Sequence, residues 1–337
     1  MKPLILLCFG FASAFAASTP QESLLVLSKG DHTLAIVDPS NLQVVARMPV
    51  GNDPHEVIAS SDGKLAYVSN YGGGAYNTLA VIDLIGQKAL PHIDLGPLRG
   101  PHGLAYVGDK TWFTAEAAKA IGRYDPATGK VDWILGTGQN RTHMIYVTPD
   151  MKQIFTTNVA SGTVSIIDKT EGRRPDWNET VVPVGHGDEG FDITPNGTQL
   201  WTANAQDGTV SIIDIPSKKV IATLDANVPG ANRLKLTPDG KLVFISSLGK
   251  AGVAILDAAT RKQVKRLDLG GGAAGIQMQP DGSRAYVACT GCNYVAVVGL
   301  KSLEVEGKID AGPQPDGMAW SVIRSPTAAA QSRSRQH

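Results

Sequence analysis

The runs Val164-Ser165-Ile166-Ile167-Asp168 and Val210-Ser211-Ile212-Ile213-Asp214 are two copies of one pattern, a mostly apolar stretch that ends in Asp. The same pattern ends at Asp38, Asp83, Asp125 and Asp257, and a seventh run is followed by Gly299. Successive ends lie 45, 42, 43, 46, 43 and 42 residues apart. This period is typical of one four-stranded propeller blade. The seven runs therefore predict seven blades.

The segments between these runs supply the other strands of each blade. One period contains residues 56–60, a turn at Asp62-Gly63, residues 65–70 and, after the run, residues 88–94. The turn recurs as Pro195-Asn196-Gly197, Pro238-Asp239-Gly240 and Pro280-Asp281-Gly282. Pro presets φ and Gly accepts positive φ, so these triplets favour hairpin turns between antiparallel strands. The sequence predicts an all-β chain with no sizeable helix.

The two ends of the chain fit one closed ring. Residues 24–28, 33–38 and 43–48 supply only the outer strands of a blade, and residues 315–322 supply a single inner strand. Pairing them completes the seventh blade and leaves no inner edge free. The prediction is a propeller over residues 21–323, a monomer, followed by a disordered tail over residues 324–337.

The first residues predict export from the cell. Lys2 precedes an apolar run over residues 4–11, and Ala14-Phe15-Ala16 offers a cleavage site for signal peptidase. We therefore expect a signal peptide over residues 1–17, cleaved near Ala16, and a mature protein in the periplasm or secreted. No other segment has about 18 consecutive apolar residues, so the mature chain is expected to have no membrane span.

Charge and cysteine content narrow the class of partner. Lys plus Arg and Asp plus Glu number 31 each, which gives none of the basic excess that phosphate backbones attract. Nucleic acid is therefore not expected as a partner, which leaves a small molecule, a metal ion or another periplasmic protein. Cys289 and Cys292 are the cysteines that remain after signal cleavage, and we expect them to form a disulfide in an oxidising compartment.

One register position links the blades to a candidate site. The residue seven places before each turn Asp or Asn begins the inner strand, which lines the channel of a propeller. In chain order these residues are His55, His102, His143, Glu189, Asn232 and Ala274, and Asp316 takes this place in the closing strand. Three histidines are therefore expected to converge at one mouth of the channel.

Neutral imidazoles and a carboxylate suit a divalent transition metal such as zinc, copper or iron. The predicted metal ligands are His55, His102, His143 and Glu189. Glu189 is also a candidate catalytic base. In the alternative interpretation these histidines bond to one another and to water in a polar funnel.

Charged residues around this ring extend the candidate site. Arg99, Arg141 and Arg233, with Asn232 and Asp316, are predicted to orient an anionic or zwitterionic ligand. The turns at residues 71–76 and 289–292 are expected to open on the same face.

Tyr67-Val68-Ser69-Asn70, residues 154–158 and residues 200–204, each followed by an apolar run with Asp, resemble the repeats of exported bacterial YVTN propellers. That family is related to propellers that bind haem d1. The resemblance implies a propeller fold and an exported setting, with a channel histidine as axial ligand if haem d1 is bound.

The blade that contains residues 100–105 and 112–116 resembles those of streptogramin lyases, which are metal-dependent propellers. It makes Glu116 a second catalytic candidate, although the inserted Ala115 is expected to turn this carboxylate to the opposite face. Our leading hypothesis is a periplasmic protein that binds a metal ion, cofactor or small ligand at a histidine-lined mouth. The alternatives are a metal-dependent lyase or lactonase-like hydrolase, and a protein-interaction scaffold.

Overall fold

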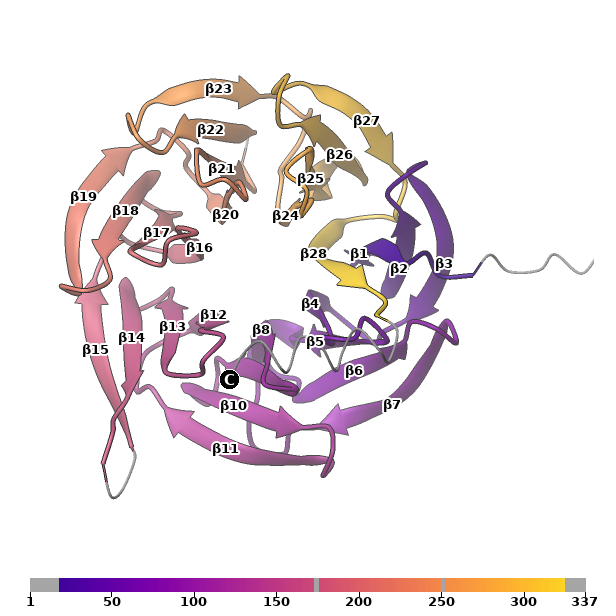
Figure 1. Cartoon of the computed structure of the whole chain (residues 1–337), viewed down its shortest axis with the longest axis horizontal. Helices are drawn as coiled ribbons and strands as arrows, with labels where there is room; N and C mark the ends of the chain where they lie inside the picture. The colour runs from indigo at the N-terminus through magenta and orange to yellow at the C-terminus, as the bar shows by residue number, and fades with distance from the viewer. Residues whose placement is uncertain (1–17, 173–175, 250–251, 325–337) are drawn as a thin grey trace, which may run out of the picture.

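A computed structural model describes residues 18–172, 176–249 and 252–324, which form a ring of seven sheets around a central channel (Figure 1). Each sheet has four antiparallel strands, and the strand next to the channel is the first of its blade. The predicted seven-bladed propeller is confirmed. The expected signal peptide and residues 325–337 of the expected tail lie outside the described residues.

The closing blade, blade 1, joins the two ends of the chain as predicted. Its strands, from the channel outward, are β28 (Pro315–Val322), β1 (Glu22–Ser28), β2 (Thr33–Asp38) and β3 (Gln43–Pro49). The pairing of β28 with β1 is antiparallel and sets Leu25 opposite Ala319 and Val26 opposite Met318.

The other six blades follow one another along the chain, each from the channel outward. Blade 2 contains β4 (Pro54–Ala59), β5 (Leu65–Asn70), β6 (Thr78–Asp83) and β7 (Lys88–Asp94). Blade 3 contains β8 (Pro101–Val107), β9 (Lys110–Ala115), β10 (Ala120–Asp125) and β11 (Lys130–Gly136). Blade 4 contains β12 (Thr142–Val147), β13 (Gln153–Asn158), β14 (Thr163–Lys169) and β15 (Trp177–Pro183). Blade 5 contains β16 (Asp188–Ile193), β17 (Gln199–Asn204), β18 (Thr209–Asp214) and β19 (Lys219–Asp225). Blade 6 contains β20 (Ala231–Leu236), β21 (Leu242–Ser247), β22 (Val253–Asp257) and β23 (Gln263–Leu267). Blade 7 contains β24 (Ile276–Met278), β25 (Arg284–Cys289), β26 (Tyr294–Gly299) and β27 (Val305–Ile309).

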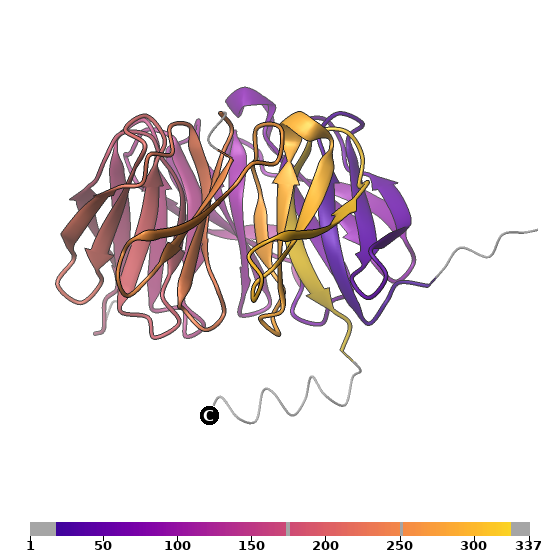
Figure 2. The same ribbon diagram turned by 90° about the horizontal axis from the view of Figure 1, so that it is seen from above.

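The helical structure of the described residues is limited to two single turns. These are η1 (Gly72–Gly74) and η2 (Thr290–Cys292), and both rise on the same face of the ring (Figure 2). No helix in the described part of the chain is long and apolar enough to span a bilayer.

The apolar runs that revealed the repeat are the third strands of the blades, which neighbouring blades cover on both sides. In β2 the side chains of Leu34, Ala35, Ile36 and Val37 are all fully buried, so both faces of the strand lie in the core. The outer strand β19 instead alternates between exposed and partly buried residues, because only one of its faces packs against the core.

The two predicted partner cysteines lie together at the end of β25 and in η2. The Cα atoms of Cys289 and Cys292 are 5.1 Å apart and their sulfur atoms are at bonding distance, so the predicted disulfide is confirmed.

Candidate functional site

A repeated backbone hydrogen bond shows that the seven predicted site positions are equivalent. In every blade, the N–H group of a residue just after the second strand donates to the carbonyl of the residue two before the site position. The seven bonds, each 2.9–3.1 Å, run from Lys29 to Gln314, Tyr71 to Asp53, Glu116 to Gly100, Val159 to Arg141, Ala205 to Gly187, Leu248 to Gly230 and Gly291 to Gly272. Asp316, His55, His102, His143, Glu189, Asn232 and Ala274 therefore form one ring, here called the mouth ring.

A hydroxyl near the end of the second strand holds a mouth-ring residue of the next blade in place in three blades. Thr114 Oγ1, in β9 of blade 3, donates to the carbonyl of His143 in the next blade, at 2.6 Å. Thr157 donates in the same way to the Glu189 carbonyl at 2.8 Å, and Ser246 to the Ala274 carbonyl at 2.6 Å. The repeat therefore fixes the backbone of a site residue from the neighbouring blade.

The donors of the repeated bond form a second ring of side chains beside the mouth ring. Blades 1 to 3 place Lys29, Tyr71 and Glu116 there, and the other four blades place Val159, Ala205, Leu248 and Gly291. The polar members all come from one side of the propeller. The site is therefore asymmetric although the fold is a repeat.

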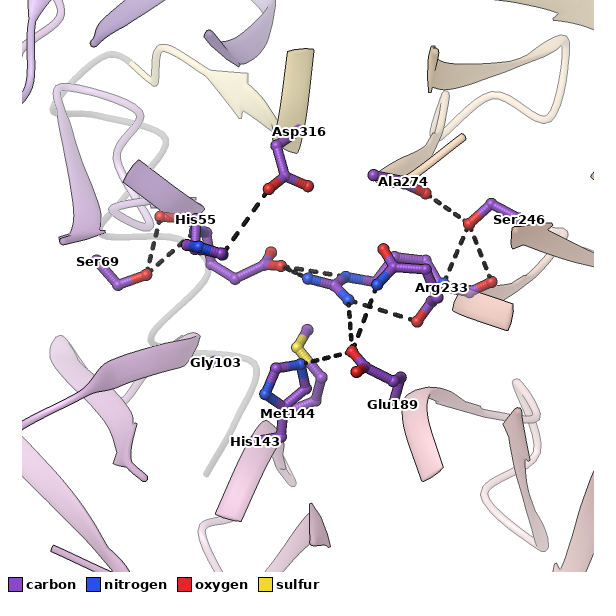
Figure 3. A network of polar contacts seen from close by, with 12 residues as sticks. His55, Ser69, Gly103, His143, Met144, Glu189, Arg233, Ser246, Ala274 and Asp316 are labelled. Atoms are coloured by element: carbon purple, nitrogen blue, oxygen red, sulfur yellow. Dashed lines mark hydrogen bonds and ion pairs between the residues drawn. The ribbon is translucent and has the colours of Figure 1, made fainter. Parts of the chain in front are cut away.

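The residue after each mouth-ring position is either a glycine packed against the backbone of the next blade or a residue with a longer side chain. Four blades have Gly103, Gly190, Gly275 and Gly317, where an added Cβ would lie 2.2–2.5 Å from a carbonyl oxygen of the next blade. The remaining three blades have Glu56, Met144 and Arg233. Arg233 Nε lies 3.1 Å from Glu56 Oε1, and Arg233 Nη2 contacts the same oxygen. This ion pair joins blades 2 and 6 across the channel (Figure 3).

His143 is held between two carboxylates. Its Nδ1 is hydrogen-bonded to Glu116 Oε1, and its Nε2 lies 3.0 Å from Glu189 Oε2, although not in the alignment of a hydrogen bond. Figure 3 shows Glu189 between His143 and Arg233. Burial opposes the imidazolium, but Glu189 and Glu116 outweigh it and raise the pKa of His143. Burial likewise opposes the ionised Glu189, whose pKa His143 and two arginines lower to about 2.

The other two histidines of the mouth ring, His55 and His102, lie beside His143 and have a lowered pKa. The ring of His102 lies against that of His143, with centroids 3.7 Å apart and planes tilted by 32°, and its centroid lies 4.9 Å from that of His55. Burial is the main cause that lowers the pKa of both His102 and His55. His102 is 2% exposed, and its Nδ1 has no hydrogen-bond partner among the described residues.

Lys29 belongs to the site although the sequence analysis missed it. Its Nζ lies 2.9 Å from His55 Nε2, 3.4 Å from Asp316 Oδ2 and 3.5 Å from Asp53 Oδ1. Its position in the repeat could have identified it, because Lys29 follows the second strand of its blade as Tyr71 does in blade 2.

The predicted metal ligands come together, but not as a preformed metal centre. In the described part of the chain, no group of three or more His, Cys, Asp and Glu residues is arranged to hold a metal ion. Both nitrogens of His143 face carboxylates, and the ammonium group of Lys29 lies against His55. Both histidines therefore have charged neighbours from the chain itself.

The expectation that Glu116 points to the opposite face is wrong. Strand β9 ends at Ala115, so Glu116 lies in the following turn, where strand alternation no longer applies. Its side chain is 3% exposed, accepts a hydrogen bond from Tyr71 Oη at 2.5 Å and contacts His143.

The predicted ligand-binding residues divide into two groups. Arg233, Asp316 and Asn232 lie within the network, where Asn232 Nδ2 donates to Glu189 Oε2 at 3.4 Å. Arg141 lies at its edge and is 45% exposed. Arg99 is exposed and donates to the Ala75 carbonyl, so the structure does not bring it to the carboxylates.

Asp188, beside Glu189, should make stability depend on pH. It is fully buried, and burial raises its pKa to about 8, above the unfolded value near 4. The contribution of protonated Asp188 to the free energy of unfolding is therefore complete below about pH 4 and is lost as the pH rises to about 8. We expect Asp188→Asn to stabilise the protein by roughly 3–5 kcal/mol at about pH 9 and by much less at about pH 5, in urea denaturation. A gain that is equal at both pH values would contradict this prediction.

Fold and site together define a seven-bladed β-propeller whose channel is bridged by an ion pair below a buried cluster of histidines and carboxylates. No protein-family model matches the chain, and no curated protein matches it. The resemblances to YVTN-repeat proteins and streptogramin lyases therefore rest on the sequence segments alone.

Solved structures of low sequence identity share the fold. A functionally unknown protein from Desulfotomaculum acetoxidans has a TM-score of 0.74 at 13% identity, over 90% of this chain and 99% of that one. A candidate 6-phosphogluconolactonase from Bacteroides fragilis has a TM-score of 0.71 at 16% identity, over 90% and 99%. The dihydro-haem d1 dehydrogenase NirN, in complex with DHE, has a TM-score of 0.64 at 16% identity, over 89% and 75%.

Proposed function

We propose that this protein binds a small polar ligand at the mouth ring. The observation that carries the proposal is the concentration of unpaired polar atoms there. Eight buried side-chain atoms of the described residues lack a hydrogen-bond partner. Two of them belong to the mouth-ring residues His102 and Asn232, and a third to Asp188 beside the ring. A fourth, His143 Nε2, has the carboxylate of Glu189 at 3.0 Å. A buried polar atom without a partner costs about 1–3 kcal/mol, so a ligand that supplies donors and acceptors would recover that energy.

The form of the mouth limits how such a ligand would enter. Glu56 and Arg233 bridge the channel below, so the open approach is from the face where η1 and η2 rise. His102 and Asn232 come from blades 3 and 6, which would let one ligand contact opposite sides of the ring. The proposal also includes export to the periplasm, which the amino-terminal sequence and the Cys289–Cys292 pair support.

A second candidate function is acid–base catalysis of the lyase or lactonase type. It is favoured by the chain of contacts from Tyr71 through Glu116 and His143 to Glu189, because a histidine between two carboxylates can give up and regain a proton. A neighbouring structure is a candidate lactonase, which agrees with this class. Haem d1 binding, suggested by the NirN neighbour, would use His102 or His55 as the axial ligand.

Mass spectrometry of the protein exported by its own cells tests ligand binding even though the ligand is unidentified. We expect the native mass to exceed the denatured mass, and the mass difference to distinguish a metal ion from an organic molecule. His102→Ala should lose the adduct because it removes a buried ligand contact. His186→Ala is the matched control, since the side chain of His186 is 79% exposed, and it should retain the adduct. Equal native and denatured masses in the wild type would contradict the proposal.

A further inference from the structure

The residue two places before each mouth-ring position has a left-handed backbone in six of the seven blades. Three blades have glycine there, namely Gly100 (φ 70°), Gly187 (φ 74°) and Gly230 (φ 71°). Three have a side chain instead, namely Asp53 (φ 49°), Arg141 (φ 55°) and Gln314 (φ 52°). Glycine adopts this conformation at least cost, and Asp tolerates it better than long side chains do. Arg141 therefore has a side chain at a position that favours glycine.

The contacts of Arg141 within the chain leave part of its guanidinium group open to solvent. Its Nε lies 3.5 Å from Glu116 Oε2 and its Nη2 lies 4.0 Å from Glu189 Oε1, both beyond the usual hydrogen-bond distance. The side chain is 45% exposed. Both carboxylates are mostly buried, and the charge of Arg141 helps to lower the pKa of each, but the arginine makes no hydrogen bond of usual length to either.

Arg233 provides a contrast within the same site. Its side chain is 7% exposed, and its Nε and Nη2 both contact Glu56 Oε1. The guanidinium of Arg233 is thus used in the ion pair with Glu56 across the channel. The guanidinium of Arg141 lies near Glu116 and Glu189, and part of it is exposed to solvent. The buried His102 Nδ1, which has no hydrogen-bond partner among the described residues, is an independent sign of a ligand at this mouth, and the His102 ring lies against that of His143.

We propose that Arg141 binds the anionic group, a carboxylate or a phosphate, of the ligand at the mouth ring. The planar guanidinium matches either oxyanion with two parallel hydrogen bonds. The inference rests on the proposed function and adds the charge class of the ligand.

The test compares two substitutions at the same register position. Arg141→Gly removes the guanidinium and relieves the backbone, and Gln314→Gly relieves the backbone only. Citrate and inorganic phosphate, which separate the two sources of anionic oxygen, are titrated by calorimetry into ligand-stripped protein. We expect the wild type and Gln314→Gly to bind at least one of these anions and Arg141→Gly to bind it at least about tenfold more weakly. Both variants should melt at or about 1–2 °C above the wild-type temperature, which shows that lost binding is not lost folding.

The outcomes distinguish this inference from the proposed function. If the exported protein carries an adduct but neither anion binds, or both bind Arg141→Gly as tightly as the wild type, the role of Arg141 is refuted and ligand binding stands. If no adduct is present and no anion binds, both proposals fail. An Arg141→Gly variant that melts well below the wild type would show that this arginine has a structural role, which overturns the inference.

Discussion

A mature chain that ends at Gly312 is expected not to fold. It lacks β28, so β1 would have an unpaired edge along the channel, and the pairing of Leu25 with Ala319 and Val26 with Met318 would be lost. Met318 and Ala319 are buried in two separate apolar clusters, so their removal opens the core on both sides of blade 1. Burial of a side chain of this kind contributes about 1.5–3 kcal/mol, and a whole strand of such contacts exceeds the usual stability of a domain.

Circular dichroism and a thermal melt of the truncated chain are the measurements, with a chain that lacks only residues 325–337 as the control. The control should melt within a few degrees of the full-length mature protein, because the described contacts of β28 are retained. A cooperative melt of the Gly312 truncation at the full-length temperature would show that β28 does not close the ring.

Substitution of Arg233 by Ala should destabilise the protein by about 3–5 kcal/mol. The guanidinium is almost fully buried and pairs with Glu56 across the channel, with Glu189 Oε2 3.8 Å from its Nη1. Its removal leaves two nearly buried carboxylates without this cation. The penalty is mainly that of an unpaired buried charge.

A double variant separates the pair from the space that it fills. Glu56→Gln with Arg233→Met removes both charges and keeps similar volumes, so it should recover most of the stability lost in Arg233→Ala. Urea denaturation of wild type, single and double variants at one pH gives the comparison. If the double variant were as unstable as Arg233→Ala, loss of packing and not the unpaired charge would explain the effect.

The local sequence determined the fold and its closure. Three features recur along the chain: the apolar runs, the Asp-Gly and Asn-Gly turns and the spacing near 43 residues. They recur because every blade packs against its two neighbours in the same way. The repeat also determined the register, so the sequence alone placed His55, His102 and His143 on one ring. Equivalent residues in a repeat occupy equivalent places, which is why this part could be predicted.

Only the tertiary structure decided how the site residues pair. Glu56 and Arg233 are 177 residues apart and meet because closure of the ring sets blades 2 and 6 across one narrow channel. Lys29 reaches His55, and Glu116 reaches His143, through turns whose side-chain directions do not follow strand alternation. The sequence therefore supplied the members of the site. Their charges and partners depend on distances between different blades, which a repeat pattern does not encode, so the ion pairs among them could not be read from the sequence.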